Sequence, residues 1–333
     1  MSMNTRLWTD IDYDKSGKQV GWLNLHRSVT RSAYGMLTIP LAVIKNGTGP
    51  TVLLMAGNHG DEYEGQIGLV KLIRSLKPEQ IQGRVIIAPA INLPAALAGT
   101  RVSPLDDGNM NRSFPGDPDG GPTKQIAHYV DSVLFPMADL FHDFHSGGSS
   151  LDYMEFASTH ESGNVDVDAR GLAALKAFGA PLSLVWQGSS DTRFSPHAAM
   201  KRGVAALGGE FGGCGRVSRF GVDLVSKGAL RLLAHMHVID KQKAPPVTTS
   251  VRMVAVPGPD YFVYAPDNGL FEPATELGDD VRAGQLCGHV HFVDDPAREP
   301  VPCQFKQSGF VVCKRHFGRV ERGDCVAHLA IDA

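Results

Sequence analysis

Apolar residues in the first two thirds of the chain alternate between short unbroken runs and runs with helical spacing. Unbroken runs at 51–57 and 84–89 predict buried strands, and apolar residues at three-residue spacing over 67–76 predict a helix between them. This strand–helix–strand order is typical of a mostly parallel or mixed sheet flanked by helices, so the predicted fold class is α/β. Further elements expected in this part are strands at 140–144, 182–186 and 204–207, and helices at 168–178 and from Ser195.

The start of the chain carries a β pattern of its own. Residues 20–48 favour strands that close in a turn rich in Asn and Gly, which predicts a β extension over 1–48. Much later, a polar and proline-containing stretch at 240–250 is typical of a linker. We therefore predict that residues 1–245 form one α/β domain that includes the β extension.

Beyond the linker the helical spacing disappears, and short β runs alternate with Gly and Pro turns. Two similar passages, at 281–287 and 320–326, form a weak internal repeat. This pattern predicts a smaller all-β domain over 251–333, of the barrel or sandwich kind. The region resembles the folds that carry biotin or lipoyl groups, although the lysine that those folds modify has no counterpart in it. We expect this domain to be a lid or wall beside a site in the larger domain.

Size and composition restrict the function classes. The 333 residues exceed what one core usually fills, and 43% hydrophobic and 20% charged residues are ordinary for a soluble globular protein. A net charge of -3 argues against nucleic acid or an anionic membrane surface as the main partner. We find no apolar run of about 18 residues that would span a bilayer, and the polar residues 1–14 do not resemble a signal peptide. Five cysteines without a C-x-x-C pair predict reduced thiols in a cytoplasmic protein.

The residues that suggest chemistry gather where predicted strands end. His59 and Glu62 follow the buried strand at 51–57, in a turn that also contains Gly57 and Gly60. In α/β folds this edge of the sheet is where ligands bind. A catalytic zinc ion takes three protein ligands from His, Glu, Asp or Cys and leaves one position for water. We therefore expect this turn to supply two of three zinc ligands.

The third ligand is expected from the end of another strand, and His145 is the best candidate. Strand alternation places Asp143 and His145 on one face and His142 on the other, so His142 is only a fallback ligand. Asp143 is then placed to orient a ligand or an arginine. The alternative is that His59 and His145 are ordinary polar residues in turns.

Four short motifs then occur in a defined order: H-x-x-E at 59–62, N-R at 111–112, D-x-H at 143–145 and G-E-F-G at 209–212. In this order they resemble the succinylglutamate desuccinylase/aspartoacylase family, which belongs to the zinc carboxypeptidase-like superfamily. The resemblance covers about residues 50–215, and the family also carries a C-terminal β domain. It implies an enzyme with one zinc ion per chain that removes an acyl group from the nitrogen of an amino acid.

The resemblance also implies roles for individual residues. His59, Glu62 and His145 would hold the zinc ion. Glu210 would be the general base that takes a proton from water and delivers it to the leaving amine. The alternative for Glu210 is a glutamate at a strand end that faces solvent. Glu64 competes with Glu62 as a ligand, although its place in the motif favours solvent or a helix start.

Substrate binding is implied for two further positions. Arg112 would grip a substrate carboxylate with two parallel hydrogen bonds, and Asn111 would add a neutral donor. Arg101 resembles a second arginine of the family that polarises the scissile carbonyl, with a structural ion pair as the alternative. The chain departs from the family pattern between 101 and 111, where the spacing is longer and Asn109 and Met110 replace the usual Asp-Leu.

The chain as a whole most resembles the family branch that acts in ectoine breakdown and deacetylates Nα-acetyl-L-2,4-diaminobutyrate. The expected partner is thus a small N-acyl amino acid, and a homo-oligomer is compatible with the sequence. The ammonium group of such a substrate suggests an acidic partner, for which we consider Asp106, Asp107 and Asp117. Other activities left open are an aspartoacylase or succinylglutamate desuccinylase-like deacylase, a metallocarboxypeptidase, and a metal-binding protein without catalysis.

Overall fold

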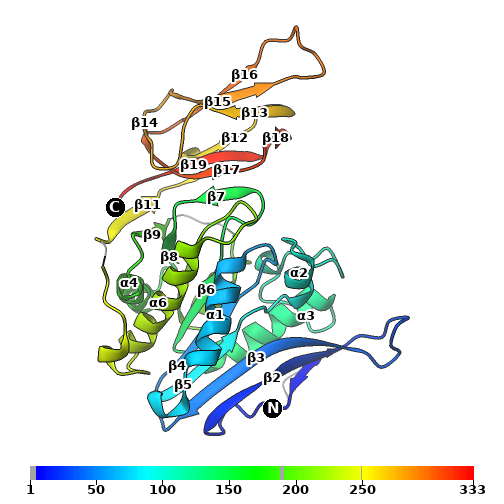
Figure 1. Ribbon diagram of the computed structural model, residues 1–333, viewed down its shortest axis with the longest axis vertical. Coiled ribbons are helices and arrows are strands. Elements are labelled where there is room, and N and C mark those ends of the chain that lie inside the picture. The colour runs from blue at the N-terminus through cyan, green and yellow to red at the C-terminus, as the bar shows by residue number, and fades with distance from the viewer. Residues whose placement is uncertain (1–4, 188–190, 249) are drawn as a thin grey trace.

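The unbroken apolar runs form the centre of one large mixed sheet. A computed structural model describes residues 5–187, 191–248 and 250–333 (Figure 1). Residues 1–4 of the predicted β extension and Thr249 of the predicted linker lie outside the described residues. At the centre, β4 (Thr51–Ala56) pairs in parallel with β5 (Gly83–Ala88) and with β6 (Leu140–Phe144). Next to β6, and parallel to it, lies β10 (Ala205–Glu210).

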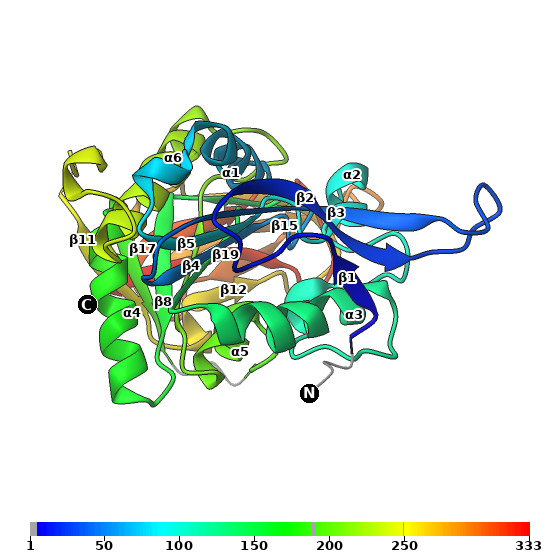
Figure 2. The ribbon, with the colours of Figure 1, turned by 90° about the horizontal axis from the view of Figure 1, so that it is seen from below.

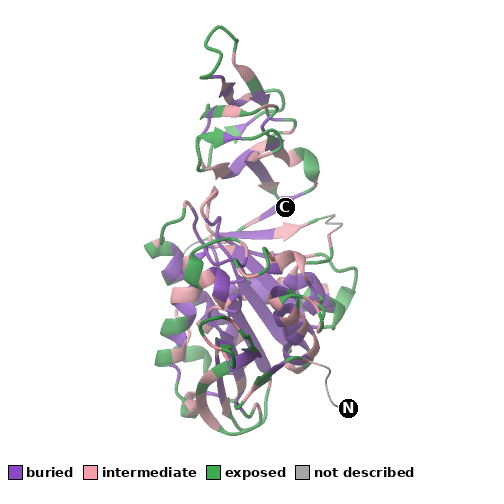
Figure 3. Ribbon diagram, turned by 90° about the vertical axis from the view of Figure 1, so that its right-hand side faces the viewer, coloured by how far each residue is buried: buried purple, intermediate pink, exposed green. Residues whose placement is uncertain are grey.

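The strand β4 explains why these runs are unbroken. Leu53 and Met55 belong to the core on one face of the sheet, whereas Leu54 and Ala56 belong to the core on the other. Both faces of the central strands are therefore covered, and no polar face is left (Figure 3). Because β4, β6 and β10 run in parallel, their carboxyl ends meet at the same edge of the sheet.

The other strands extend the sheet on both sides. Towards the N-terminus the order from β5 outwards is β3 (Met36–Asn46), β2 (Gly17–His26) and β1 (Leu7–Thr9). Beyond β10 the order is β8 (Phe156–His160), β9 (Leu182–Trp186), β11 (Arg252–Val256), β19 (Cys325–Asp332), β17 (Gly309–Arg315) and β14 (Asp280–Val281). Off this path, β12 (Phe262–Tyr264) pairs with β19, and β7 (Leu151–Tyr153) pairs with β17. A separate antiparallel sheet has the order β16 (Val301–Gln304), β15 (Leu286–His291), β13 (Gly269–Pro273) and β18 (Arg319–Val320).

In the described part of the chain, six α-helices cover the central sheet. They are α1 (Tyr63–Ser75), α2 (Leu93–Ala98), α3 (Pro122–Tyr129), α4 (Val165–Phe178), α5 (Ser195–Lys201) and α6 (Arg219–His235). Helices α1 and α6 lie on one face and α3 and α5 on the other (Figure 2). Short 3-10 turns occur at Pro78–Gln80, Met110–Arg112, Phe135–Met137, Lys241–Lys243 and Pro259–Tyr261, and a π-helical turn at Val130–Leu134. The predicted fold class, a mixed sheet flanked by helices with a smaller β part, is confirmed.

The sheet does not stop where the C-terminal β region begins. Strand β11 pairs in parallel with β9 on one side and antiparallel with β19 on the other. Hydrogen bonds therefore run from the α/β part into the β part without a break. Within the described residues, no helix is long and apolar enough to cross a membrane.

The stretch at 240–250, whose composition predicts a linker, is held at its centre by the buried side chain of Arg231. Arg231 of α6 donates from Nε to the carbonyl oxygen of Pro245 and from Nη2 to that of Pro246, both at 3.0 Å. Its Nη1 donates to the carbonyl oxygens of Phe178 and Gly179, at 2.8 and 3.2 Å. One guanidinium thus joins the end of α4 to the chain segment that leads into β11.

We expect the substitution Arg231→Met to lower the free energy of unfolding by about 2–4 kcal/mol, because it removes a charged donor from four carbonyl groups, of which those of Phe178 and Gly179 are buried. The matched control is Lys227→Met on the same helix. Lys227 is partly exposed and pairs with Asp223 at 2.7 Å, an arrangement worth less than about 1 kcal/mol. Urea unfolding of both variants checks this, and equal losses would contradict the role given to Arg231.

Candidate active site

Two strand ends bring three candidate metal ligands together. The chain leaves β4 at Ala56 and enters α1 at Tyr63, and His59 and Glu62 lie on the connecting turn. His145 directly follows β6, whose last residue Phe144 pairs with Ala56. Gly60 is required in the turn, because a Cβ atom there would lie 1.9 Å from the carbonyl group of Ala95.

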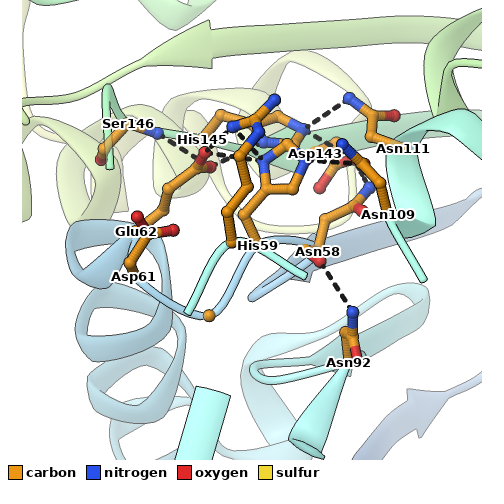
Figure 4. A network of polar contacts seen from close by, with 12 residues as sticks. Asn58, His59, Asp61, Glu62, Asn92, Asn109, Asn111, Asp143, His145 and Ser146 are labelled. Atoms are coloured by element: carbon orange, nitrogen blue, oxygen red, sulfur yellow. Dashed lines mark hydrogen bonds and ion pairs between the residues drawn. The ribbon is translucent and has the colours of Figure 1, made fainter. Parts of the chain in front are cut away.

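The three side chains converge on one point. His59 Nδ1 lies 2.6 Å from Glu62 Oε1, and His145 Nδ1 lies 2.8 Å from Glu62 Oε2 (Figure 4). One potential ligand atom from each residue lies within 4.8 Å of those of the other two. All three residues are buried, with exposed fractions of 2%, 3% and 8% for His59, Glu62 and His145. We call these residues the trio, which could hold a metal ion.

Contacts on the outer side of each imidazole fix its orientation. His59 Nε2 lies 3.1 Å from Asn109 Oδ1, and His145 Nε2 lies 3.0 Å from Asp143 Oδ2. Both partners are acceptors, so each Nε2 is placed to donate a hydrogen to its partner, and each Nδ1 faces the Glu62 carboxylate. Two imidazole nitrogens and one carboxylate that face one another in this way are a donor set that fits a metal ion.

Electrostatics within the trio support this interpretation. Burial opposes ionisation of Glu62, but the neighbouring His59 and His145 lower the pKa of its carboxyl group below the usual value. Burial also acts to lower the pKa of His145, yet the carboxylates of Asp143 and Glu62 raise it well above the usual value. The site thus already concentrates negative charge around the imidazoles, as a cation would require.

Asp143 lies against His145, which is the position expected of a residue that orients a ligand. Its Oδ2 also accepts hydrogen bonds from Asn58 Nδ2, at 2.9 Å, and from Ser195 Oγ. His142 faces the opposite side of β6, where its ring is stacked on Phe144 with centroids 3.8 Å apart. The fallback ligand is therefore outside the trio.

Glu64 is held inside the protein by hydrogen bonds to two other segments. It is buried and accepts hydrogen bonds from Ser146 Oγ at 2.6 Å and from the backbone nitrogen of Ser218 at 2.7 Å. The expectation that Glu64 faces solvent is wrong, whereas its location in the first turn of α1 agrees with a helix-start role. It connects the loop after β6 to the start of α6.

The structure places Glu210 beside the trio, at the carboxyl end of β10. The backbone of His145 bridges this end, because its nitrogen donates to Gly209 and its oxygen accepts from Phe211, both at 3.0 Å. Glu210 Oε2 is buried and has no hydrogen-bond partner among the described residues. Burial, followed by the negative charge of Glu62, raises the pKa of Glu210 to about 8. Such a carboxyl group can exchange protons near neutral pH.

Of the two predicted arginines, Arg101 contacts the trio and Arg112 lies near Arg101. Arg101 Nη1 lies 3.4 Å from Glu62 Oε1 and 3.3 Å from His59 Nδ1. The guanidinium of Arg112 stacks 4.3 Å from the ring centroid of Phe194, and its Nη1 donates to the carbonyl oxygen of Asn111. Burial, and then the positive charge of Arg101, lower the pKa of Arg112. Two positive groups are thus near each other beside the candidate metal position.

Asn111 links the two sides of the site. Its Nδ2 lies 3.5 Å from His145 Nε2, and its Oδ1 accepts a hydrogen bond from the backbone nitrogen of Ser195 at 2.9 Å. The sequence did not identify Asn109, Asn58 or Ser195 as parts of the site. For Asn109 a signal existed, since it replaces the aspartate that the family pattern leads one to expect.

The acidic residues considered for a substrate ammonium group have other contacts. Asp106 accepts hydrogen bonds from the backbone nitrogen and Oγ1 of Thr123, at the start of α3. Asp117 accepts from the backbone nitrogen of Asp119 in its own turn. Asp107 lies on an exposed turn with a positive φ of 50°. The geometry gives no support to an ammonium site at these residues.

Comparisons with known proteins show a matching family model and a relative of similar length. Residues 48–236 match the family model described as the succinylglutamate desuccinylase/aspartoacylase catalytic domain. An N-alpha-acetyl-L-2,4-diaminobutyric acid deacetylase of Halomonas elongata is 38% identical over 320 residues, which cover 96% of this chain and 93% of that protein.

Solved structures extend the similarity to the whole chain. A succinylglutamate desuccinylase/aspartoacylase from Rhodobacter sphaeroides has 42% identity and a TM-score of 0.91, over 99% of this chain and 100% of that one. The product-bound ectoine utilization protein EutE (DoeB) from Ruegeria pomeroyi has 38% identity and a TM-score of 0.93, over 98% and 99% of the two chains.

A first test of the trio uses two neighbouring histidines. We expect His145→Ala to abolish stoichiometric zinc binding, because only two ligands remain. His142→Phe is the matched control and should retain zinc, since His142 packs against Phe144 on the other face of the strand. Elemental analysis of both purified variants measures the bound metal. Loss of zinc in the control alone would contradict the assignment.

Asn109 provides a second test. Removing the acceptor of His59 Nε2 frees the imidazole to rotate or change tautomer, so Asn109→Ala should weaken zinc binding about 10–100-fold. Competition with a chromogenic chelator measures the dissociation constant. Asn46→Ala, at the exposed last residue of β3, is the control and should leave the affinity unchanged. An unchanged affinity in the Asn109 variant would show that the contact does not orient His59.

Proposed function

This chain belongs to the succinylglutamate desuccinylase/aspartoacylase family, and we propose that it is a zinc-dependent deacylase that hydrolyses Nα-acetyl-L-2,4-diaminobutyrate. The products are acetate and 2,4-diaminobutyrate. The observation that carries the proposal is the buried convergence of His59, Glu62 and His145 beside the unpaired carboxyl oxygen of Glu210. The similarity to the Halomonas deacetylase over 96% of the chain supports this substrate.

Two imidazoles and one carboxylate are a donor set typical of catalytic zinc, with room left for water and substrate. His59, Glu62 and His145 would hold one zinc ion per chain. When bound, zinc supplies a Lewis acid that polarises the scissile carbonyl group and lowers the pKa of water. Asn109 and Asp143 keep both imidazoles in the tautomer that presents Nδ1.

Glu210 is the proton carrier of the proposed reaction. Its carboxylate takes a proton from the attacking water, whose oxygen then bonds to the acetyl carbon. The carbon–nitrogen bond breaks, and Glu210 delivers the proton to the leaving amine. The absence of a hydrogen-bond partner for Oε2 among the described residues leaves this oxygen available for the transfer.

Two arginines and one asparagine would position the substrate. The guanidinium of Arg112 binds the α-carboxylate, and its stacking on Phe194 limits its movement. Asn111 Nδ2 adds a neutral donor next to it. Arg101, whose Nη1 lies within 3.4 Å of the trio, is placed to stabilise negative charge on the acetyl oxygen during attack. We also place the enzyme in the cytoplasm, where its five free thiols stay reduced.

A substrate panel on zinc-loaded protein tests the proposal. We expect acetate release from Nα-acetyl-L-2,4-diaminobutyrate to be at least about tenfold faster than from N-acetylaspartate, because the Halomonas elongata relative, 38% identical to this chain, is named as a deacetylase of the former. A preference for N-acetylaspartate would assign an aspartoacylase, and release of C-terminal residues from peptides would assign a carboxypeptidase. Either result would overturn the proposed substrate.

The control for chemistry is Glu210→Gln. This variant should keep its zinc, and its kcat should fall about 10²–10⁴-fold, because the amide cannot carry the proton. Colorimetric detection of acetate and elemental analysis of the same sample separate loss of catalysis from loss of metal.

A further inference from the structure

Five aromatic side chains form a continuous series from the predicted carboxylate site to the proposed proton carrier. We call this series the aromatic arc; in spatial order it consists of Phe194, His160, Trp186, His328 and Tyr153. Successive ring centroids lie 6.4, 6.2, 6.1 and 5.4 Å apart. The arc begins at Phe194, on which Arg112 stacks, and ends at Tyr153. The pKa of the Tyr153 hydroxyl is raised by burial, by Cys313 and then by Glu210.

Sheet register places the arc on the same face as Glu210. In the antiparallel pair β8–β10, Glu210 lies opposite Phe156, and β8 then carries His160 four positions later on the same face. In the parallel pair β8–β9, His160 lies beside Trp186. The Trp186 ring stacks against His160 with an interplanar angle of 19° and is only partly buried.

The arc carries no positive charge at neutral pH. Burial lowers the pKa of His160 to about 3 and that of His328 to about 4, so both imidazoles are neutral. Asp191, which lies beside Arg112, is the alternative that we consider for binding a cation. Its carboxylate is already bonded by Arg193 Nε and Nη2, both at 2.9 Å, and lies 3.5 Å from Arg112 Nε.

We propose that the aromatic arc, with Trp186 at its centre, binds the side-chain ammonium group of the substrate through cation–π attraction. This inference rests on the proposed function. The arc starts at the ring on which Arg112 stacks, and its His160 and Trp186 lie on the same sheet face as Glu210. A substrate whose carboxylate is held by Arg112 and whose amide is attacked beside Glu210 would therefore present its side chain to the arc. Tryptophan offers the strongest attraction of the aromatic side chains to a cation within about 6 Å of its ring. The arc thus selects a short amino acid with a cationic side chain without a dedicated carboxylate.

The test compares two substrates that differ only at the charged atom. Nα-acetyl-L-norvaline has the same carboxylate and amide as Nα-acetyl-L-2,4-diaminobutyrate, with a methyl group in place of the ammonium. We expect Trp186→Leu to lower the ratio of kcat/KM for the diaminobutyrate compound to that for the norvaline compound by about tenfold. Trp186→Phe should retain most of the preference for the diaminobutyrate compound, because phenylalanine still offers an aromatic face. The control Trp22→Leu, at a residue 58% exposed on β2, should leave the ratio unchanged.

A second measurement uses protein with an intact arc. With Trp8 and Trp22 both changed to Phe, Trp186 is the sole tryptophan of the three in the chain. Its fluorescence should change on addition of 2,4-diaminobutyrate, and much less with norvaline. Equal responses to the two amino acids would overturn the inference.

The kinetic outcomes separate this inference from the proposed function. An unchanged ratio in Trp186→Leu, or a ratio lost in Asp191→Asn instead, would overturn the arc as the ammonium site while the deacylase activity stands. Wild-type protein that cleaves neither compound would overturn the proposed function, and the ammonium site with it.

Discussion

The candidate active site depends on the parallel pairing of β4 and β6. That register puts Ala56 next to Phe144, so the residues that follow each strand emerge at the same edge of the sheet. Glu62 can then bridge the two imidazoles with one oxygen towards each. A shift of one strand by a single residue would turn His145 to the face that His142 occupies, and the convergence would be lost. The apolar residues that fix this register thereby fix the site.

Much of this arrangement could be predicted from local sequence. The strands at 51–57, 84–89 and 140–144 are readable because both their faces are buried and their apolar runs are unbroken. Strand alternation, together with the place of His145 at the end of its strand, favoured His145 over His142 as the third ligand. The partners of the imidazoles were harder to predict, because Asn109 lies in an irregular loop whose path depends on contacts with distant segments. Alternation also identifies a strand without identifying its neighbour, which is why β11 was not recognised as part of the large sheet.

Helix α6 shows a different limit of sequence interpretation. It was not predicted, and it contains Gly221 and Gly228, which lower helix propensity. The structure gives the physical reason for both glycines. A Cβ atom at Gly228 would lie 2.2 Å from the ring of Phe178, and one at Gly221 would lie 1.8 Å from the carbonyl oxygen of Phe211. The close approach of α6 to its neighbours therefore requires glycines, and these glycines weaken the helix propensity by which the helix would have been identified. Likewise, the aromatic arc joins residues from four strands and a helix boundary, which no local pattern connects.

The position of β11 also bears on how the chain can be shortened. Strand β9 pairs with β8 along one edge and with β11 along the other, and β11 pairs in turn with β19. A polypeptide ending before Arg252 would leave β9 with a row of unpaired amide and carbonyl groups, and such an open edge is a template for aggregation. The C-terminal β part is thus a protective cover for the catalytic sheet as well as its continuation.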